Sequence, residues 1–375
     1  MSKSIVVCCD GTANEFSKAR TNVAKIYSVL PKSAPDQVNY YHPGVGTMAP
    51  PGFVTRQGER VAEVLGMAFG YGLANDVRDA YVFLAQTFQP GDRVFMFGFS
   101  RGAYTVRALA SLLYMYGLVA PFNTGLVPYA VRMLWAIRRL RIQDPASAAR
   151  GNAVSDYFRL AAEFKATFST ECKPYFLGLW DTVSSVGWFT SPVSLPYTAS
   201  NPDIAVARHA LSIDERRAFF RPNVWRPKPD GGPRDLRQVW FPGVHGDVGG
   251  GYEESASGLS KFPLGWMISE AVEHGLRVDH PTVDKVLGRC GKPFAAPDAD
   301  APMHDSLSSA WKPLELLPLP KWDATKGTRT WRTNDGAPRR LPRQAIVHDV
   351  AWLRGGGRYA ERLPTHAVPL SQATW

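Results

Sequence analysis

The sequence predicts an α/β protein built on a doubly wound, mostly parallel β-sheet. Short, nearly all-apolar segments rich in aromatic and β-branched residues recur along the chain, as expected of strands buried on both faces. Segments with apolar residues at helical spacing separate them, and this alternation is typical of right-handed crossover connections. The chain has 375 residues, of which 45% are hydrophobic, so it can bury the large core that this fold needs.

Predicted strands and helices alternate strictly in the first third of the chain. The segment 4–9 reads Ser-Ile-Val-Val-Cys-Cys, and 93–97 is similarly apolar, so both predict buried strands. The helix that reaches Leu30 begins near Thr21 or Asn22, either of which is a favourable N-cap. In order, the expected elements are strand 4–9, helix 21–30, strand 38–41, helix 75–88, strand 93–97 and a helix 104–118 that Gly117 stops.

The alternation is interrupted at 121–170, where the sequence predicts a cap-like helical insertion. Residues 129–142 place apolar side chains beside several arginines at helical spacing. We expect this basic amphipathic helix to pack on the domain, and contact with an anionic membrane surface is the alternative.

The remaining elements complete the sheet and leave a C-terminal extension. We expect a strand at 174–180, a helix at 209–220 whose charges are structural, and the last strand of the sheet at 238–241. Residues 1–290 are therefore expected to form one α/β domain. Residues 291–375 are rich in proline and arginine, and we expect them to pack on that domain as an extension.

The segment Gly98-Phe99-Ser100-Arg101-Gly102 joins a predicted strand to a predicted helix. Its two glycines remove side chains that would collide in a sharp turn, so the pattern predicts a nucleophile elbow with Ser100 at its tip. The free N–H groups of a helix N-terminus favour the negative charge of acyl transfer. A chance match is the alternative, and the flanking strand and helix argue against it. A phosphate-binding loop is disfavoured, because no Gly-Lys-Ser/Thr or G-x-G-x-x-G pattern follows a strand here.

A carboxylate and an imidazole follow two later predicted strands. Asp181 comes directly after strand 174–180, and His245 lies in a glycine-rich loop after strand 238–241. The order Ser, Asp, His is that of an α/β-hydrolase-like fold, and we predict Ser100 as nucleophile, His245 as base and Asp181 as the orienting acid. A strand-end cap is the alternative for Asp181, and His304 is the alternative histidine.

The loop after the first strand should lie beside the elbow, because parallel strands end at the same edge of the sheet. The backbone N–H groups of Gly11 and Arg101 are the predicted oxyanion hole. Asp10, Thr12 and Asp247 are expected to contact the substrate or support the site. A helix or loop cap is the structural alternative for Asp10.

Composition limits the partners and the compartment. The net charge of +10 and the isoelectric point near 9.5 suit anionic lipid, and nucleic acid is not expected because the chain has no aromatic-basic recognition module. The four cysteines form neither a disulfide framework nor a C-x-x-C metal motif, so we expect them to be reduced. The N-terminus lacks the apolar core of a signal peptide, and we expect a chain that is cytoplasmic as synthesised.

Several segments, in this order, resemble one known family. They are Cys9–Thr12, Thr21–Val23, Gly44–Thr47, Gly98–Tyr104, Trp180–Val183 and Gly243–Tyr252, with Asp214–Arg217 and parts of Val347–Tyr359 in addition. The family is the α/β-hydrolase family long labelled a domain of unknown function, which includes the family-1 phospholipase effectors of type VI secretion. The resemblance implies a serine esterase acting on lipid, with Ser100, Asp181 and His245 at the triad positions. It also implies export by a secretion system that needs no signal peptide, with a secretion or immunity partner.

The sequence therefore predicts a cofactor-free serine hydrolase that cleaves acyl esters of lipids or phospholipids through an acyl-enzyme. Metal-dependent hydrolysis is one alternative, with Asp10, His245 and Asp247 as ligands. A non-catalytic binding module on a hydrolase scaffold is the other, since a fold does not guarantee a function.

Overall fold

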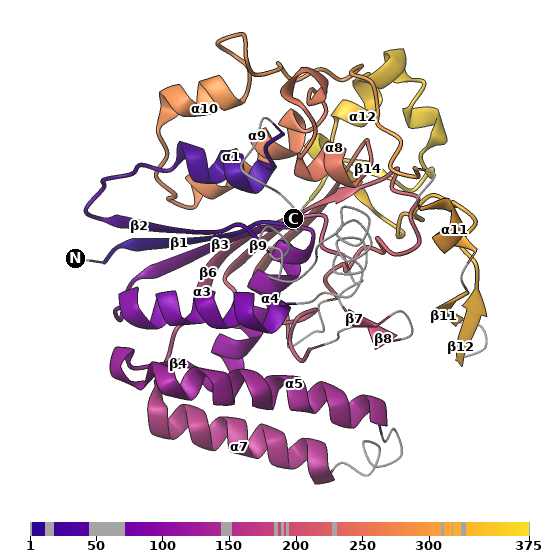
Figure 1. Cartoon of the computed structure of the whole chain (residues 1–375). Helices are drawn as coiled ribbons and strands as arrows, with labels where there is room; N and C mark the ends of the chain where they lie inside the picture. Colours follow the sequence, from indigo (N-terminus) through magenta and orange to yellow (C-terminus); the bar gives the residue numbers. More distant parts are fainter. Residues whose placement is uncertain are drawn as a thin grey trace, which may run out of the picture.

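The computed structural model describes residues 2–374 except 12–18, 45–71, 144–151, 184–186, 189–190, 193–194, 227–230, 309–310, 317 and 324–327. A central sheet lies between helices on its two faces, and a further pair of helices packs outside one of these layers (Figure 1). This arrangement confirms the predicted fold class.

The central sheet has eight strands in the order β14-β13-β10-β9-β6-β3-β1-β2, and every neighbouring pair is parallel. The strands are β1 (Ser4–Cys9), β2 (Gln37–His42), β3 (Arg93–Phe99), β6 (Pro174–Trp180), β9 (Val206–Ser212), β10 (Asp235–Phe241), β13 (Ile346–Val347) and β14 (Val368–Pro369). Because β1 lies between β2 and β3, the strand order reverses there. This point is the topological switch at which α/β sheets form their ligand crevice, beyond the carboxyl ends of the strands.

Helices cover both faces of this sheet, with α3 and α4 on one side and α1 and α9 on the other (Figure 1). The helices outside the insertion are α1 (Asn22–Val29), α3 (Leu73–Thr87), α4 (Arg101–Tyr116), α8 (His245–Gly249), α9 (Lys261–Glu273), α10 (His280–Val286), α11 (Lys312–Glu315) and α12 (Val350–Leu353). Alternation along β1 divides the core: Ile5 and Val7 pack with α3 and α4, whereas Val6 and Cys8 pack with α1 and α9. The predicted caps also form, since Thr21 caps α1 and Gly117, with φ 66°, ends α4.

The predicted insertion is a pair of packed helices. It consists of η1 (Pro121–Leu126), α5 (Val127–Gln143) and α7 (Asn152–Phe168), flanked by the antiparallel pair β4 (Leu118–Val119) and β5 (Ser169–Thr170). Figure 1 shows the pair as an outer layer beyond α3 and α4. Val127, Leu134 and Ile137 are buried there, so the apolar face of α5 packs on the domain as expected.

The expected helix at 209–220 is wrong, because His209 lies in the central strand β9. All seven residues of that strand are buried, including three polar ones, Arg208, His209 and Ser212. Arg208 forms ion pairs with Asp235 on β10 and Glu270 on α9, both at a long separation in sequence. The charge of Arg208 conceals the strand in the sequence, because the acidic partners that neutralise it lie on other elements. The residues after Ser212 form a loop.

The strand at 238–241 is not the last strand of the sheet. It is the end of β10, and β13 and β14 of the C-terminal extension continue the sheet beyond it. Each of these two strands spans only two residues, too few to show an alternating pattern in the sequence.

The shorter elements outside this sheet are β7 (Gly187–Trp188), β8 (Ser191–Pro192), β11 (Leu319–Asp323), β12 (Thr328–Arg332), η2 (Glu254–Ala256), η3 (Arg354–Gly357), η4 (Ala360–Arg362) and η5 (Leu370–Gln372). Within the described residues, none of the helices has the length and apolar character to cross a membrane.

Candidate active site

Ser100 stands between the end of β3 and the first residue of α4. Its backbone dihedrals, φ 56° and ψ −118°, lie in a region that non-glycine residues rarely occupy. Such a conformation costs on the order of 1–3 kcal/mol and is held only by its surroundings. One support is the Ser100 N–H, which donates to the carbonyl of Trp180 on β6 at 3.0 Å. This is a sharp strand-to-helix turn, the backbone geometry expected of the predicted nucleophile elbow.

The glycines on either side of Ser100 allow backbone segments to approach closely. A Cβ atom on Gly98 would lie 2.5 Å from the carbonyl oxygen of Gly102, and one on Gly102 would lie 2.1 Å from that of Cys9. Both distances are too short for real Cβ contacts, so both positions require glycine. The second contact also places the elbow directly against the end of β1.

Asp181 follows β6, the strand next to the one that carries Ser100. Its side chain is fully buried, and its Oδ2 lies 2.5 Å from Nδ1 of His245. The backbone N–H of Ser212, at the end of β9, donates to Asp181 Oδ1 at 3.0 Å, and the Ser212 hydroxyl donates to Oδ2 at 3.2 Å. The ends of two neighbouring strands therefore hold this carboxylate.

His245 is the first residue of α8, and its ring lies beside the elbow. The ring centroid is 4.6 Å from that of Phe99 and 4.8 Å from that of Phe220. Because Phe99 immediately precedes Ser100, this packing brings the imidazole to the turn that carries the serine. The structure thus groups Ser100, Asp181 and His245 at the carboxyl edge of the sheet.

Burial and hydrogen bonding together set the charges of the pair. Burial raises the pKa of Asp181, but the Arg339 guanidinium and His245 outweigh this effect and hold that pKa well below its usual value. Burial lowers the pKa of His245, and the bond to Asp181 opposes this only in part. The carboxylate is therefore ionised and the imidazole neutral near pH 7. Since Nδ1 donates to Asp181, Nε2 carries the lone pair that can accept a proton.

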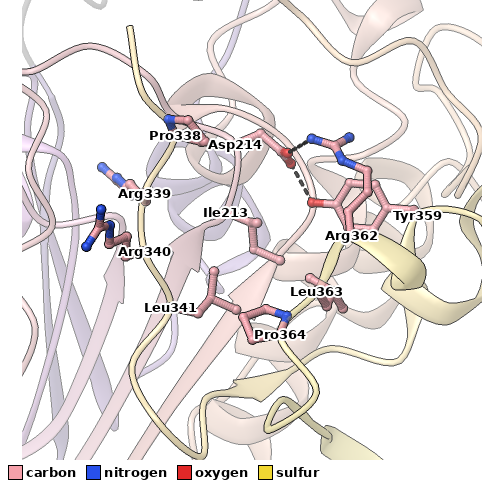
Figure 2. A pocket seen from close by; sticks show the side chains of 10 residues that line it. All are labelled: Ile213, Asp214, Pro338, Arg339, Arg340, Leu341, Tyr359, Arg362, Leu363 and Pro364. Atoms are coloured by element: carbon pink, nitrogen blue, oxygen red, sulfur yellow. Dashed lines mark hydrogen bonds and ion pairs between the residues drawn. The ribbon is translucent and has the colours of Figure 1, made fainter. Parts of the chain in front are cut away.

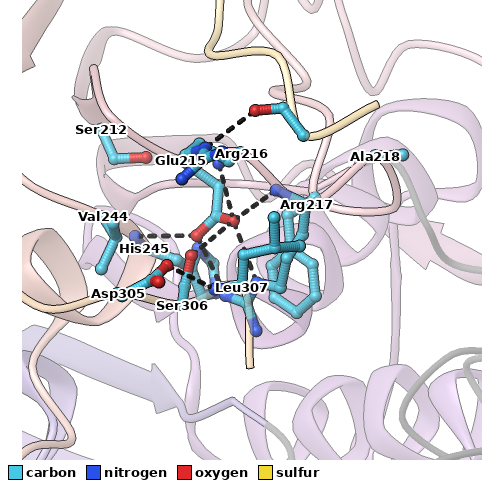
Figure 3. A network of polar contacts seen from close by, with 12 residues as sticks. Ser212, Glu215, Arg216, Arg217, Ala218, Val244, His245, Asp305, Ser306 and Leu307 are labelled. Carbon is cyan, nitrogen blue, oxygen red and sulfur yellow. Dashed lines mark hydrogen bonds and ion pairs between the residues drawn. The ribbon is translucent and has the colours of Figure 1, made fainter. Parts of the chain in front are cut away.

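A buried carboxylate, Glu215, holds the backbone of His245 (Figure 3). Its Oε2 accepts the His245 N–H at 3.1 Å, and its Oε1 accepts the Ser306 hydroxyl at 2.9 Å. The guanidinium of Arg217 donates to both oxygens, at 2.9 and 3.0 Å. Burial raises the pKa of Glu215, but the bonds and charge of Arg217 outweigh burial and lower it to about 2.

The two predicted oxyanion-hole residues follow neighbouring strands, Arg101 after β3 and Gly11 after β1. Arg101 occupies the first position of α4 and is buried. The N–H of Gly11 donates to Asp10 Oδ1 at 2.7 Å. Asp10 Oδ2 accepts hydrogen bonds from the Thr21 hydroxyl at 2.5 Å and the Tyr41 hydroxyl at 2.7 Å, so this carboxylate joins the end of β1 to the N-cap of α1 and to β2. Thr12 lies outside the described residues.

Asp247 pairs with His304, the alternative histidine. Asp247 Oδ1 lies 2.6 Å from His304 Nδ1, and Oδ2 accepts the backbone N–H of Val244 at 3.0 Å. The ring of Tyr252 stacks on His304 at 3.6 Å. Of the two candidate histidines, His245 is therefore the one bonded to Asp181.

The ligand set of the metal alternative does not converge. Among the residues that the structure describes, no three His, Cys, Asp or Glu side chains form a group that could hold a metal ion. Asp10 is instead bonded to Thr21 and Tyr41, and Asp247 to His304.

Two residues that hold Asp181 and His245 in place were not among the predicted site residues. Glu215 belongs to a charged run that is expected to form a helix with structural charges, although Asp214–Arg217 is one of the segments that resemble the family. Arg339 lies in a proline-rich stretch without periodicity, yet its guanidinium donates to both oxygens of Asp181, at 2.5 and 3.0 Å. Both contacts depend on the folded chain, since Arg339 is 158 residues from Asp181.

A cavity of about 370 Å³ lies behind the segment that carries Arg339. Figure 2 shows its apolar floor, formed by Ile213, Leu341 and Leu363, while the side chain of Arg339 points away from it. At its rim, Tyr359 donates to Asp214 at 2.6 Å. The cavity therefore lies beside the candidate active site rather than within it.

Comparison with known proteins identifies one family. The family described as "T6SS, Phospholipase effector Tle1-like, catalytic domain" matches residues 3–270. An uncharacterized protein of Saccharomyces cerevisiae, YEL023C, is 35% identical over 235 residues, which is 60% of this chain and 33% of that protein. The chain thus spans about a third of the length of this relative.

Three solved structures match the chain at low similarity. An uncharacterized protein from Pseudomonas aeruginosa has a TM-score of 0.43 and 21% identity, covering 75% of this chain and 47% of its own. A Tle1 effector bound to the VgrG spike of the type 6 secretion system has a TM-score of 0.35 and 16% identity, covering 69% and 52%. The Vlm2 thioesterase domain has a TM-score of 0.30 and 12% identity, covering 74% and 94%. Likeness at this level gives no information on activity.

Proposed function

This chain belongs to the family of Tle1-like phospholipase effectors of type VI secretion, and we propose that it hydrolyses lipid esters with Ser100, His245 and Asp181 as its catalytic triad. The observation that carries the proposal is the buried contact of 2.5 Å between His245 and Asp181, packed against the elbow. The strained backbone of Ser100 supports it, since strain of this kind clusters at active sites.

The chemistry follows from the charges of the three groups. As the Ser100 Oγ attacks the ester carbonyl carbon, its proton passes to Nε2 of His245. Asp181 stabilises the imidazolium that forms and keeps Nδ1 protonated. Collapse of the tetrahedral intermediate breaks the ester C–O bond, and the leaving alcohol takes the proton from His245. Water then attacks the acyl-enzyme with the same base, releasing the carboxylic acid and free Ser100.

The oxyanion of the intermediate needs donors at the elbow. We propose the backbone N–H of Arg101, at the N-terminus of α4, as one of them, because it lies next to the nucleophile and at the positive end of the helix. We propose the N–H of Gly11 as the second. It donates to Asp10 in this structure, so its use requires that bond to be exchanged for the one to the oxyanion.

An aromatic cluster beside His245 is the proposed contact for the acyl group. The ring of Phe220 lies 5.4 Å from that of Trp311 and 4.8 Å from that of His245. The Arg217 guanidinium, which is paired with Glu215, stacks over Phe220 at 3.5 Å and helps to fix that ring. Apolar surface of this kind beside the proposed base suits the acyl chain of a lipid ester. Family membership further supports export without a signal peptide and a secretion partner.

The test compares the wild-type chain with Ser100→Ala on phosphatidylglycerol and phosphatidylethanolamine vesicles, with released fatty acid as the measurement. We expect the wild type to release fatty acid and Ser100→Ala to lose turnover by at least about 10³-fold while its circular dichroism is unchanged. Turnover by Ser100→Ala that a chelator abolishes would favour the metal-dependent alternative. A wild-type chain that cleaves no ester would favour the binding module.

A further inference from the structure

The Asp181 carboxylate accepts hydrogen bonds from a residue far along the chain, Arg339 of the C-terminal extension. Arg339 Nη1 donates to Asp181 Oδ1 at 2.5 Å, and Nη2 donates to Oδ2 at 3.0 Å. One planar group thus contacts both oxygens, which is the bidentate geometry that a guanidinium provides and an ammonium group does not.

The guanidinium is itself held on its other side. Nη1 also donates to the carbonyl and hydroxyl oxygens of Ser212, at 3.1 and 2.6 Å, and Nη2 donates to the carbonyl of Phe220. The side chain of Arg339 is only 6% exposed. It therefore joins the end of β6, the end of β9 and the loop whose Phe220 ring packs on His245.

We infer that Arg339 is a positioning residue of the active site: its guanidinium sets the rotation of the Asp181 carboxylate so that Oδ2 faces Nδ1 of His245. The inference rests on the proposed triad and adds a member that its motifs do not contain. Arg339 lies outside residues 3–270, which match the family, so the active site of this chain extends into the C-terminal extension.

The geometry and the charge of Arg339 have separable effects. Without the bidentate contact from Arg339, the Asp181 carboxylate can rotate. The rotation misplaces His245 and slows proton transfer, and small misplacements of this kind cost about 10²-fold in rate. Losing the charge removes a cation near the Asp181–His245 pair. The imidazolium is then better stabilised, so the base titrates at higher pH. Arg339→Lys tests the first effect alone, and Arg339→Met tests both.

The experiment measures kcat, KM and the pH profile on a soluble short-chain ester for Arg339→Lys, Arg339→Met and the control Arg340→Met. Arg340 is the exposed neighbour of Arg339 on the same segment. We expect both Arg339 variants to lose about 10²-fold in kcat with KM within about twofold of wild type. The acidic limb should stay in place in Arg339→Lys and move to higher pH in Arg339→Met, while Arg340→Met should behave as wild type.

Circular dichroism and thermal unfolding show which variants are folded. If Arg339→Met does not fold, the kinetics of Arg339→Lys alone test the inference. Wild-type kcat in folded Arg339→Lys, with Ser100→Ala inactive in the same assay, overturns the inference and leaves the triad intact. An equal loss in Arg340→Met also overturns it, because the effect then belongs to the whole segment. Turnover by Ser100→Ala defeats the proposed triad itself, whatever the Arg339 variants do.

Discussion

Burial shifts the pKa values of Asp181 and His245 in opposite directions. It disfavours the charged form of both, so it raises the pKa of Asp181 and lowers that of His245. Only Asp181 has enough compensation, from Arg339 and from His245, to stay ionised. The result is a carboxylate beside a neutral imidazole, which is the resting state that a serine nucleophile needs.

The pH dependence of esterase activity tests that charge assignment. A general base works only when it is neutral, and the pKa of His245 lies below its ordinary value of 6.5 because the ring is buried. Activity should therefore persist as pH falls to 6.5 and decline only below it. The measurement is kcat/KM for a soluble ester between pH 4 and 9. An acidic limb centred above 6.5 contradicts the assignment.

Glu215 should contribute to stability as an ionised group. Its pKa is about 2 in the folded chain against an ordinary value of 4.5, so its contribution is complete above pH 4.5 and disappears as pH falls towards 2. The shift corresponds to about 3 kcal/mol at neutral pH. We expect Glu215→Gln to lose about this free energy of unfolding in urea at pH 7. Glu273→Gln, at an exposed position of α9, is the matched control and should change it by less than about 0.5 kcal/mol. Equal stability of the two variants contradicts the role given to Glu215.

At the scale of elements, the elbow depends on the close approach of β1, β3 and α4. Gly98 lies in β3 and Gly102 in α4, and a side chain at either position would collide with backbone. Backbone cannot move aside as a flexible side chain can, so the turn and its strained serine depend on these glycines.

Gly102→Ala should therefore destabilise the chain far more than a comparable change elsewhere. Its Cβ would lie 2.1 Å from the carbonyl oxygen of Cys9, and overpacking of this kind costs about 1–3 kcal/mol or more. Gly125→Ala is the control, since its Cβ would meet no atom within 4 Å. Denaturant unfolding of the two variants gives the comparison. A Gly102→Ala variant as stable as Gly125→Ala would show that the elbow tolerates a side chain.

Local patterns predicted most of the elements correctly but failed where distant residues decide the structure. The apolar runs of β1, β3 and β6 carry their own signal, as do the Thr21 cap and the Gly117 stop. β9 was missed because Arg208 is charged, and only its pairing with Asp235 and Glu270 makes it compatible with a central strand. The candidate site shows the same division. Ser100, Asp181 and His245 each come after a strand that the sequence predicts. Glu215 and Arg339 contact His245 and Asp181 only because the folded chain brings distant segments together.

At the scale of the whole molecule, the strand order explains why the candidate site lies where it does. The order reverses between β2 and β3 around β1, so the crossovers leave to opposite faces and open a crevice at the carboxyl edge. Ser100 follows β3 and Asp10 follows β1, on the two sides of this point. β13 and β14 add the C-terminal extension to the same sheet that contains β1.

The extension should also contribute stability through Tyr359. Its hydroxyl donates to the buried Asp214 at 2.6 Å, and burial raises the pKa of both groups. We expect Tyr359→Phe to lower the free energy of unfolding by about 1–3 kcal/mol, because it leaves a buried carboxylate short of one donor. Tyr129→Phe, at a side chain that is 44% exposed, should have almost no effect in the same urea titration. No difference between the two variants would show that this bond does not hold the extension.

Covalent labelling by a fluorophosphonate probe tests the triad most directly, because the probe reacts only with a serine whose proton a neighbouring base can take. We expect one modified residue by mass spectrometry, Ser100, and labelling at least about 10²-fold slower in folded His245→Ala, with His304→Ala labelled at the wild-type rate. Labelling of folded His245→Ala at the wild-type rate, or a wild-type chain in which Ser100 remains unmodified, would contradict the proposed triad.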